Sequence, residues 1–486
     1  MSKLEQHFAL FRRNVVGFNQ RFQTPYGRKK LIYADWTASG RLYGPLEEKM
    51  LKTFGPFVGN THSESNLTGS TMTAAYQTAR QIIKNYVNAG EKDVILASGY
   101  GMTSAVNKLQ RILGLKVPEK LLPYFNYEPA KKPVVFITHM EHHSNQTSWL
   151  ETIADVVCIR PDDHSLVDLN HLQELLTQYQ NRPLIIGAFT ACSNVTGIQP
   201  PYRQMARIIH EYGGICFIDF AASAPYVNIN MHPASLSEKL DGIYFSPHKF
   251  LGGPGTCGIL IFDSELYSNK IPDQPGGGTV AWTNPWGKHQ FLSDIETRED
   301  GGTPGFLQVI KTALCFELKE HMNIQIMQAR EKEQLAILFA GLSKVPGLRI
   351  LAGDIIDRLG IVSFYVEGIH YNLMVKILND RYGIQTRGGC SCAGTYGHYL
   401  LQVDRKRSRR ITEKISNGDL SEKPGWVRVS IHPLMTDQEI IFIIEAIKET
   451  VQNIGKWRED YLYNPATNEF INLSAKHEDY YDWFHL

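Results

Sequence analysis

Residues 246–255 read SPHKFLGGPG, and this lysine-bearing, glycine-rich stretch leads into a short apolar run at 258–262. An earlier apolar run at 215–218 ends in an acid, Asp219. Short apolar runs bounded by turn residues are typical of buried strands, and open α/β sheets bind their ligands beyond the carboxyl ends of the strands. The two stretches therefore predict an α/β sheet that brings Asp219 and Lys249 to the same edge.

An acid after one strand and a lysine in the loop after the next are what pyridoxal phosphate chemistry requires. The lysine serves as the Schiff base, and the acid keeps the pyridine nitrogen protonated. Each residue alone has an ordinary explanation, because an aspartate after a strand also serves as a metal or ribose ligand and a lysine beside glycines is usually solvated. Ser246 and His248, however, stand beside Lys249 and offer a hydroxyl and an imidazole to a phosphate. The combination predicts a pyridoxal phosphate enzyme.

Short apolar runs alternate with longer helical patterns from about Leu31 to Cys315, as in strand–helix–strand units on a largely parallel sheet. The expected strands are 93–97, 133–138, 155–158, 184–189, 215–219, 242–245 and 258–262. Expected helices between them include 72–87, 169–179 and 202–211. The sequence therefore predicts a large α/β domain at 35–318, with a mostly parallel seven-stranded sheet flanked by helices.

The remaining residues predict a smaller α+β domain. Residues 271–305 are rich in proline and glycine and show no helix or strand pattern, so we expect a long functional or interface loop there. A long helical pattern at 307–342 follows as a connector. The small domain is assigned residues 1–34 and 319–486, with expected strands at 360–366 and 426–431 and a closing helix at 437–454. The sequence of the tail from residue 459 onward predicts no particular role for it.

Charge and cysteine content exclude several classes of protein. The 486 residues include 50 basic and 49 acidic side chains, and this balance gives no bulk attraction to nucleic acid or to an anionic membrane. The one dense basic run, 405–410, is expected to be an exposed insertion loop. Residues 1–16 lack the apolar core of a secretory signal, and no apolar run approaches the roughly 20 residues of a membrane span. With seven scattered cysteines, we expect a soluble cytoplasmic protein.

Other strand ends carry further candidate groups for the cofactor. The segment ASGYGMTS at 97–104 follows an expected strand and opens a helix, where backbone N–H groups bind phosphate; the candidates are Gly101, Met102 and Thr103. EHHSN at 141–145 supplies imidazoles as a flat partner for the pyridine ring. No third ligand stands at a metal-like spacing from these histidines, so no metal is expected. Asn194, in SNVTG at 193–197, could reach the phenolic oxygen of the cofactor.

Taken together, the motifs resemble the class V aminotransferase family and, within it, the cysteine desulfurase and selenocysteine lyase branch. The resemblance runs from about Tyr33 to His432 and rests on Asp219, SPHK, EHH, SNVTG, GTP at 302–304 and RGGCSC at 387–392. It implies fold type I of the pyridoxal phosphate enzymes. It also implies a homodimer with its sites at the subunit interface.

The resemblance implies a role for each matching residue. Lys249 looks like the Schiff-base lysine, Asp219 like the partner of the pyridine nitrogen and His142 like the ring-stacking residue. Asn194 resembles a contact to the phenolate and the substrate. The implied phosphate ligands are Thr103, Ser246 and His248, with Thr303 reaching the cofactor of the neighbouring subunit. The implied contacts of the substrate carboxylate are Arg387 and Arg428, whose planar forks suit a carboxylate.

One position departs from the family pattern. Three residues after Asp219 the family commonly has a glutamine or histidine that contacts the phenolic oxygen, and this chain has Ala222. Ser223 is a neighbour that could compensate. The departure bears on how the cofactor is tuned and therefore on the reaction.

By the same resemblance, Cys392 stands at the position of the nucleophile that takes sulfur from L-cysteine, leaving L-alanine and an enzyme persulfide. Its loop contains the glycines of a mobile segment, and a cation or imidazole such as His398 is expected to lower the pKa of the thiol. Cys390 could relay or protect the persulfide, and a small carrier protein is a plausible sulfur acceptor. Selenocysteine is not distinguished from cysteine as the substrate.

Two other interpretations stay open. The protein could be a class V aminotransferase or another lyase that acts on a different amino acid, with incidental cysteines. It could also be a non-catalytic sulfur-carrier scaffold that keeps the fold. Ala222 supports this interpretation, and the retained lysine, aspartate and arginines argue against it.

Overall fold

The computed structural model describes the whole chain except residues 1, 62, 126–127, 477–479 and 486. Its centre is a seven-stranded sheet, and each strand begins and ends within one residue of its expected position. In order across the sheet, the strands are β4 (Asp93–Ser98), β10 (Gly258–Asp263), β9 (Gly242–Phe245), β8 (Ile215–Asp219), β7 (Ile185–Thr190), β5 (Val134–Thr138) and β6 (Asp155–Ile159). β10 runs antiparallel to both neighbours and the other pairs are parallel, so the predicted α/β class and mostly parallel sheet are confirmed.

Helices cover both faces of this sheet. Ile95 and Leu96 are neighbours on β4, yet they belong to different buried clusters, because successive side chains of a strand point to opposite faces. One face packs against α4 (Gly101–Ile112) and α5 (His143–Leu150). The other packs against α3 (Leu67–Tyr86), α6 (Leu169–Tyr179), α7 (Tyr202–Glu211) and α9 (Phe306–Met322). Burial on both faces explains why the strands read as continuous apolar runs.

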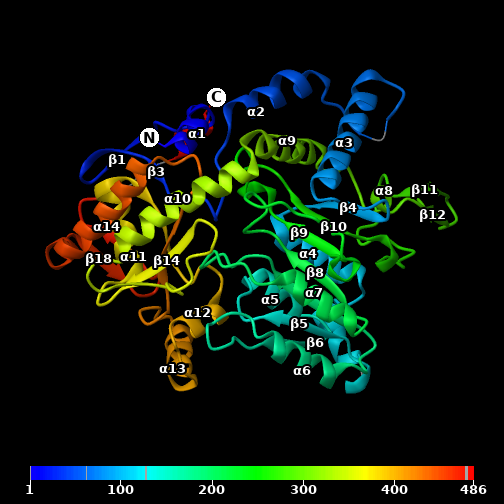
Figure 1. Cartoon of the computed structure of the whole chain (residues 1–486). Helices are drawn as coiled ribbons and strands as arrows, with labels where there is room; N and C mark the ends of the chain where they lie inside the picture. Colours follow the sequence, from blue (N-terminus) through cyan, green and yellow to red (C-terminus); the bar gives the residue numbers. More distant parts are fainter. Residues whose placement is uncertain (1, 62, 126–127, 477–479, 486) are drawn as a thin grey trace.

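A second, antiparallel sheet lies beside the first, at the left in Figure 1. Its strands, in spatial order, are β13 (Leu348–Ile350), β14 (Ile361–Val366), β17 (Trp426–Ser430) and β16 (Arg387–Gly389). The helices α1 (Lys3–Arg13), α10 (Ile324–Leu342) and α14 (Asp437–Trp457) pack beside it. The N-terminal segment is tied to this half by β3 (Ile32–Tyr33), which pairs with β15 (Ile384–Gln385).

Further short elements complete the N- and C-terminal parts. They are β1 (Arg21–Thr24), β2 (Gly27–Lys30), α2 (Gly44–Lys49), α11 (Tyr371–Ile377), α12 (Gly394–Leu400) and the tail hairpin of β18 (Tyr461–Asn464) and β19 (Glu469–Asn472). The sequence assigned no structure to this tail. None of the helices in the described part of the chain combines the length and the apolar character that a membrane crossing demands.

Three expectations about local structure are wrong. The pattern at 307–342 is two helices, because Asn323 adopts a left-handed conformation (φ +65°) and its side chain caps α10 by accepting from the N–H of Ile326. The predicted loop at 271–305 contains the hairpin β11 (Val280–Thr283) and β12 (His289–Phe291), and the short helix α8 (Ile295–Arg298). These strands are largely exposed, so they show no apolar pattern.

The basic run at 405–410 is the third correction. It is not a loop but the first half of a helix, α13 (Arg405–Ser416), which begins after the N-cap Asp404. Ile411 is its one buried side chain. The apolar signal of a helix is therefore nearly absent from its sequence, although the expectation of exposure is met.

Arg330, on α10, joins the three helices α1, α10 and α14 that pack beside the small sheet. Its guanidinium is fully buried and lies 2.8 Å from a carboxylate oxygen of Asp437 and 3.5 Å from one of Glu5, and it donates a 3.0 Å hydrogen bond to the carbonyl of Met435. Removing one partner of a buried ion pair leaves the others without a counter-charge. The pairing of α1, α10 and α14 therefore depends on this side chain.

We expect Arg330→Ala to lower the free energy of unfolding by about 3–5 kcal/mol, because the Glu5 carboxylate stays buried without its partner. Urea denaturation followed by circular dichroism measures the change. Arg349→Ala is the matched control, because its ion pair with Glu367 is 67% and 63% exposed. Equal midpoints for the two variants would contradict the role of Arg330.

Candidate active site

A cavity of about 200 Å³ opens at the carboxyl edge of the large sheet, between the two halves of the chain. Its walls come from the ends of β7, β8 and β9, the starts of α4 and α5, and residues of β16 and β17. It is lined by these predicted site residues: Met102, Thr103, His142, Asn194, Asp219, Ser246, His248, Lys249, Arg387 and Arg428. Residues far apart in the sequence therefore meet in one pocket, as the strand-end argument predicts.

Asp219 and Lys249 perturb one another inside this pocket. Burial raises the pKa of the Asp219 carboxyl to about 6, although a 2.8 Å hydrogen bond from the N–H of Ala221 and the charge of Lys249 oppose the shift. Burial lowers the pKa of Lys249 to about 8, against the attraction of Asp219 and in the same direction as the arginines 428 and 387. A lysine with this pKa is partly neutral near pH 7, so it can act as a nucleophile or base.

The start of α4 forms a cradle for an anion. Gly101 has φ +62°, and a Cβ there would lie 2.8 Å from the hydroxyl oxygen of Ser246, so a larger residue would fill the cradle. The N–H of Met102 donates a 2.8 Å hydrogen bond to that same hydroxyl, and Thr103 Oγ1 lies 2.7 Å from Ser144 Oγ. The Met102 N–H is thus occupied by Ser246, whose own proton is left to donate onward.

His142 and His248 line the pocket as neutral rings. Burial, helped by the charge of Lys249, lowers the pKa of His142 to about 3 and that of His248 to about 4. His142 is the N-cap of α5, and its Nδ1 accepts a 3.1 Å hydrogen bond from the N–H of Ser144, which fixes the ring. A fixed, flat and uncharged ring is suited to the face of an aromatic ligand.

Two arginines share one carboxylate at the opposite wall. Arg387 and Arg428 face each other across β16 and β17. Asp35 lies between them, with 2.7 Å from its Oδ1 to Nη2 of Arg428 and 3.5 Å from its Oδ2 to Nε of Arg387. Sequence reasoning missed Asp35. A weak signal was available, since Asp35 follows the apolar pair Ile32–Tyr33 as Asp219 follows its strand.

Asn194 connects the arginine wall to the cysteine loop. Its carbonyl accepts a 3.0 Å hydrogen bond from Nη1 of Arg428, and its Nδ2 donates a 2.6 Å bond to the carbonyl of Ser391. The side-chain oxygen of Asn194 and the hydroxyl of Ser391 are buried without a hydrogen-bond partner among the described residues. Both residues line the pocket, so these polar atoms are available to a ligand.

Cys392 does not line the pocket, although its neighbour Ser391 does. Both residues have left-handed backbones, at φ +50° for Ser391 and +56° for Cys392, and the Cys392 side chain is exposed. The carbonyl of Cys392 accepts a 2.7 Å hydrogen bond from the N–H of His143. From the sequence, His398 is expected to interact with the thiol of Cys392. In this arrangement its two ring nitrogens have other partners, 2.8 Å away at the carbonyl of Gly394 and 3.0 Å away at Oγ of Ser408.

Thr303 and Ser223 both lie outside the pocket. Thr303 is exposed and donates a 3.3 Å hydrogen bond to Asn60, so a contact with a neighbouring subunit stays a prediction. Ala222 lines the pocket, whereas Ser223 is fully buried and does not, so Ser223 does not replace the missing polar side chain.

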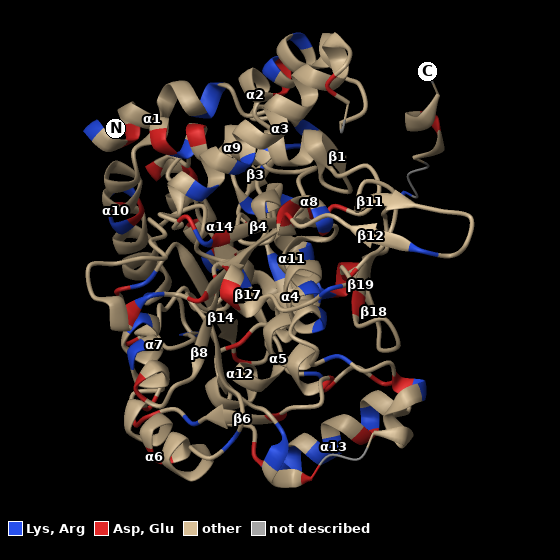
Figure 2. Ribbon diagram, turned by 90° about the vertical axis from the view of Figure 1, so that its right-hand side faces the viewer, with Lys and Arg blue, Asp and Glu red and all other residues tan. Residues whose placement is uncertain are grey.

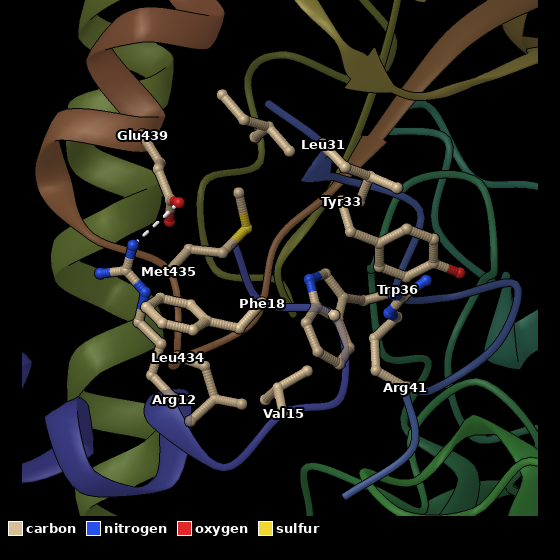
Figure 3. A pocket seen from close by; sticks show the side chains of 12 residues that line it. Arg12, Val15, Phe18, Leu31, Tyr33, Trp36, Arg41, Leu434, Met435 and Glu439 are labelled. Atoms are coloured by element: carbon tan, nitrogen blue, oxygen red, sulfur yellow. Dashed lines mark hydrogen bonds and ion pairs between the residues drawn. The ribbon is translucent and has the colours of Figure 1, made fainter. Parts of the chain in front are cut away.

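Figure 3 shows a second and smaller hollow, of about 50 Å³. Apolar side chains surround it, including Trp36, and an ion pair of 2.9 Å joins Arg12 to Glu439 at its side. None of the predicted site residues lines it, so it is not the candidate active site. Within the described ranges, no three histidine, cysteine or acidic side chains are grouped to hold a metal ion.

The larger pocket fits pyridoxal phosphate. The buried carboxyl of Asp219 suits a cationic pyridine nitrogen, and the glycine cradle at Gly101 suits a phosphate at the start of a helix. Lys249 supplies an amine with a lowered pKa. The unpartnered oxygen of Asn194 marks where a further polar group can be received.

The family model described as aminotransferase class-V matches residues 32–442. A cysteine desulfurase of Synechococcus elongatus is 27% identical over 338 residues, which cover 69% of this chain but 50% of that relative. A probable cysteine desulfurase of Mycobacterium leprae is 26% identical, over 81% of this chain and 88% of its own. Thus the chain spans half the length of one relative and most of the other.

Solved structures share the fold at lower sequence identity. The apo cysteine desulfurase of Thermococcus onnurineus superposes with a TM-score of 0.73 at 22% identity, covering 91% of this chain and 98% of that one. A cysteine desulfurase of Escherichia coli gives 0.70 at 22% identity, with 92% and 98% coverage. Both similarities concern the fold.

The lowered pKa of Lys249 yields a pH prediction for the protein without cofactor. Because the neutral amine reacts, acetylation of Lys249 should rise through a midpoint near pH 8 rather than the ordinary 10.5. Asp219→Asn should lower that midpoint, since the carboxylate raises the pKa of the amine. Mass spectrometry of peptides labelled at several pH values measures it, with the exposed Lys406 as internal reference. An unshifted midpoint would mean that the amine does not face Asp219 in a buried pocket.

Proposed function

The chain belongs to the class V aminotransferase family, and we propose that it is a cysteine desulfurase that converts L-cysteine to L-alanine and keeps the sulfur as a persulfide on Cys392. Members of this family depend on pyridoxal phosphate, and so does this enzyme. The observation that carries the proposal is one pocket that combines Asp219, Lys249 and an arginine pair, with the loop of Cys392 at its wall.

The cofactor would be held by three groups of residues. Asp219 would receive the pyridine nitrogen and Lys249 the aldehyde, while the start of α4 with Ser246 and His248 would receive the phosphate. When bound, pyridoxal phosphate withdraws electrons from the α-carbon of an amino acid and so acidifies its proton. The neutral ring of His142 would cover one face and help to exclude water.

Lys249 would take the α-proton of the substrate. Its pKa of about 8 keeps a useful fraction neutral near pH 7, and the nearby carboxyl of Asp219 limits how far burial lowers it. An amine whose pKa lies near the working pH is effective both as base and as acid.

Arg387 is better placed than Arg428 to hold the substrate carboxylate. Both Nη atoms of Arg428 are engaged, one by Asn194 and one by Asp35, and this side chain is 2% exposed. Arg387 is 47% exposed and lies at a looser 3.5 Å from Asp35. We infer that Arg387 receives the carboxylate in a fork geometry, while Arg428 fixes the wall behind it.

Cys392 would act as the sulfur acceptor. Its thiolate attacks the substrate sulfur, so that an S–S bond forms as the Cβ–S bond breaks, and the carbon skeleton takes up a proton and leaves as alanine. The thiol must enter the pocket for this step, because Ser391 lines it and Cys392 does not. Gly389, at φ +103°, gives the loop a residue of wide conformational freedom, and the left-handed Ser391 and Cys392 are strained in their present form.

A second candidate function is an aminotransferase or lyase that acts on another amino acid. Ala222 favours it, because it lines the pocket where a polar side chain would otherwise tune the cofactor. The outward thiol of Cys392 favours it as well. We further propose a homodimer, since Thr303 lies outside the pocket of its own chain and is available to a neighbour.

Brief exposure of the loaded enzyme to L-cysteine should add one sulfur atom to Cys392, as localised by mass spectrometry of its peptides. Cys392→Ser should lose this adduct and lower alanine release at least about 100-fold, because the nucleophile is gone. Cys390→Ser is the matched control and should keep both signals. Alanine release that survives in Cys392→Ser refutes the nucleophile. Transfer from other amino acids without alanine from cysteine would favour the second candidate.

Asp35→Asn tests the arginine wall. The Asp35 carboxylate pairs with Arg387 and therefore competes with the substrate carboxylate for this guanidinium. Removing it should lower KM for L-cysteine. It should also move the lower limb of the kcat profile to lower pH, because Lys249 acts as the base once the substrate is bound and Asp35 raises the pKa of its amine. Steady-state kinetics between pH 6 and 9, with the surface variant Asp419→Asn as control, measure both effects. A profile and a KM equal to those of the control would sink this role for Asp35.

A further inference from the structure

The exposed thiol of Cys392 lies beside a hollow on the outer surface that is distinct from the pocket. This outer hollow has a volume of about 660 Å³ and lies between α5 and α12. His143 belongs to its wall, donates to the carbonyl of Cys392 and accepts a 2.9 Å hydrogen bond at Nε2 from the N–H of Gly394. The loop of Cys392 is therefore held against the rim of the outer hollow.

The wall of the outer hollow carries exposed apolar side chains. Leu150 at the end of α5 is 52% exposed, and Tyr399 on α12 is 44% exposed. Together with the aliphatic Val403 they offer an apolar surface next to a reactive group. Apolar side chains gathered in a concave surface are typical of places where another polypeptide inserts a side chain.

A strongly basic helix, α13, lies next to α12 and projects from the molecule (Figures 1 and 2). Two of its cations pair with Glu422, namely Arg410 at 2.6 Å and Lys414 at 2.7 Å. Four others are exposed and have no carboxylate within ion-pair distance in the described part of the chain: Arg405, Lys406, Arg407 and Arg409. The helix therefore presents an uncompensated positive charge.

The basic helix is fixed relative to the thiol loop. Ile411, a residue of α13, is buried, and Oγ of Ser408 on the same helix lies 3.0 Å from Nε2 of His398 on α12. His398 in turn contacts the carbonyl of Gly394, two residues after Cys392. At 100° per residue, Arg405, Lys406 and Arg409 lie on the arc of the helix away from Ile411, whereas Arg407, four residues before it, lies on its side. His398 also lines the outer hollow, so the helix that carries this charge lies against the wall of the hollow.

From these contacts we propose that the outer hollow and α13 form a docking surface for an acidic protein segment that carries a thiol. The proposal rests on the desulfurase function and adds to it the acceptor and its binding place. Charge complementarity selects an acidic partner, and the apolar wall selects a polypeptide over a nucleic acid. The whole chain has a net charge of +1, so the attraction is local to α13.

Sulfur transfer at this surface needs no added oxidant or reductant. The thiolate of the partner attacks the outer sulfur of the persulfide on Cys392. A new S–S bond forms on the partner as the old S–S bond breaks, and Cys392 leaves as a thiolate. The partner then carries the persulfide, and the loop is ready for another cycle.

The test uses short peptides on the whole cofactor-loaded protein. The probes are EELCEE, its neutral analogue QQLCQQ and its basic analogue KKLCKK, with fluorescent serine-for-cysteine versions for binding. We expect EELSEE to bind at least about tenfold more tightly than the other two by anisotropy, with affinity falling as salt rises. Persulfide transfer, followed by mass spectrometry of the cysteine peptides, should follow the same order.

Two variants separate the surface from general charge effects. Changing the four unpaired cations of α13 to Gln should weaken EELSEE binding at least about tenfold and leave alanine formation with a small thiol reductant unchanged. The matched control changes four exposed lysines elsewhere to Gln, at Lys120, Lys270, Lys344 and Lys456, and should retain binding. Leu150→Ser, which removes an apolar side chain from the wall of the outer hollow and adds no charge, should also weaken binding.

Several outcomes would overturn the docking surface. Equal binding of the acidic and neutral peptides would do so, as would equal losses in the α13 variant and its control. Tighter binding of a 20-nucleotide single-stranded DNA, displaced only by nucleic acid, would assign α13 to that partner instead. If cysteine yields no alanine, the desulfurase function fails, and peptide binding still decides the surface separately.

Discussion

The carboxylate of Asp35 holds the wall of the pocket together, because it pairs with both arginines that the small sheet places opposite one another. Arg387 and Arg428 stand at the same register on adjacent strands, where like charges repel. Arg428 is nearly fully buried, and a buried cation without a partner is costly. Asp35 comes from the N-terminal segment beside β3, so this ion pair fastens that segment to β17. Through the carbonyl of Asn194, the same guanidinium reaches the loop after β7 of the large sheet. The two halves of the chain are thereby joined at the wall of the pocket.

The large sheet could be predicted closely, because its strands are buried on both faces and their apolar runs end where burial ends. Helices α6 and α7 match their predicted bounds for a similar reason, since one apolar face packs on the sheet and the other is solvated. Where burial is slight, prediction fails. The hairpin of β11 and β12 and the helix α13 bury almost nothing, so their existence depends on turns and caps such as Asp404. The break at Asn323 depends on a left-handed residue inside an uninterrupted apolar pattern.

The residues of the site also divide into those that the strand pattern predicts and those that it does not. Residues that follow strands of the large sheet, such as Asp219 and Lys249, reach the pocket because the topology gathers strand ends at one edge. Asp35 lies outside that repeating pattern, and it is brought near the arginines by the pairing of β3 with β15 and by its own bridge to Ser430 on β17. The orientation of Cys392 depends on backbone angles that residue type does not specify, because Ser391 and Cys392 both adopt a conformation that non-glycine residues rarely take.

The proposed function requires the thiol of Cys392 to reach both the pocket and the outer hollow, and the energetics of its loop bear on that exchange. Each non-glycine residue in a left-handed conformation costs on the order of 1–3 kcal/mol. Three hydrogen bonds hold the loop in this form: from Asn194 to the carbonyl of Ser391, from the N–H of His143 to the carbonyl of Cys392, and from the N–H of Gly394 to Nε2 of His143. Each contributes about 1 kcal/mol net, so the anchoring is of the same order as the strain. An exchange that brings the thiol inward therefore requires little free energy. Because Asn194 lines the pocket, a ligand that accepts a hydrogen bond from its Nδ2 competes with the anchor of Ser391.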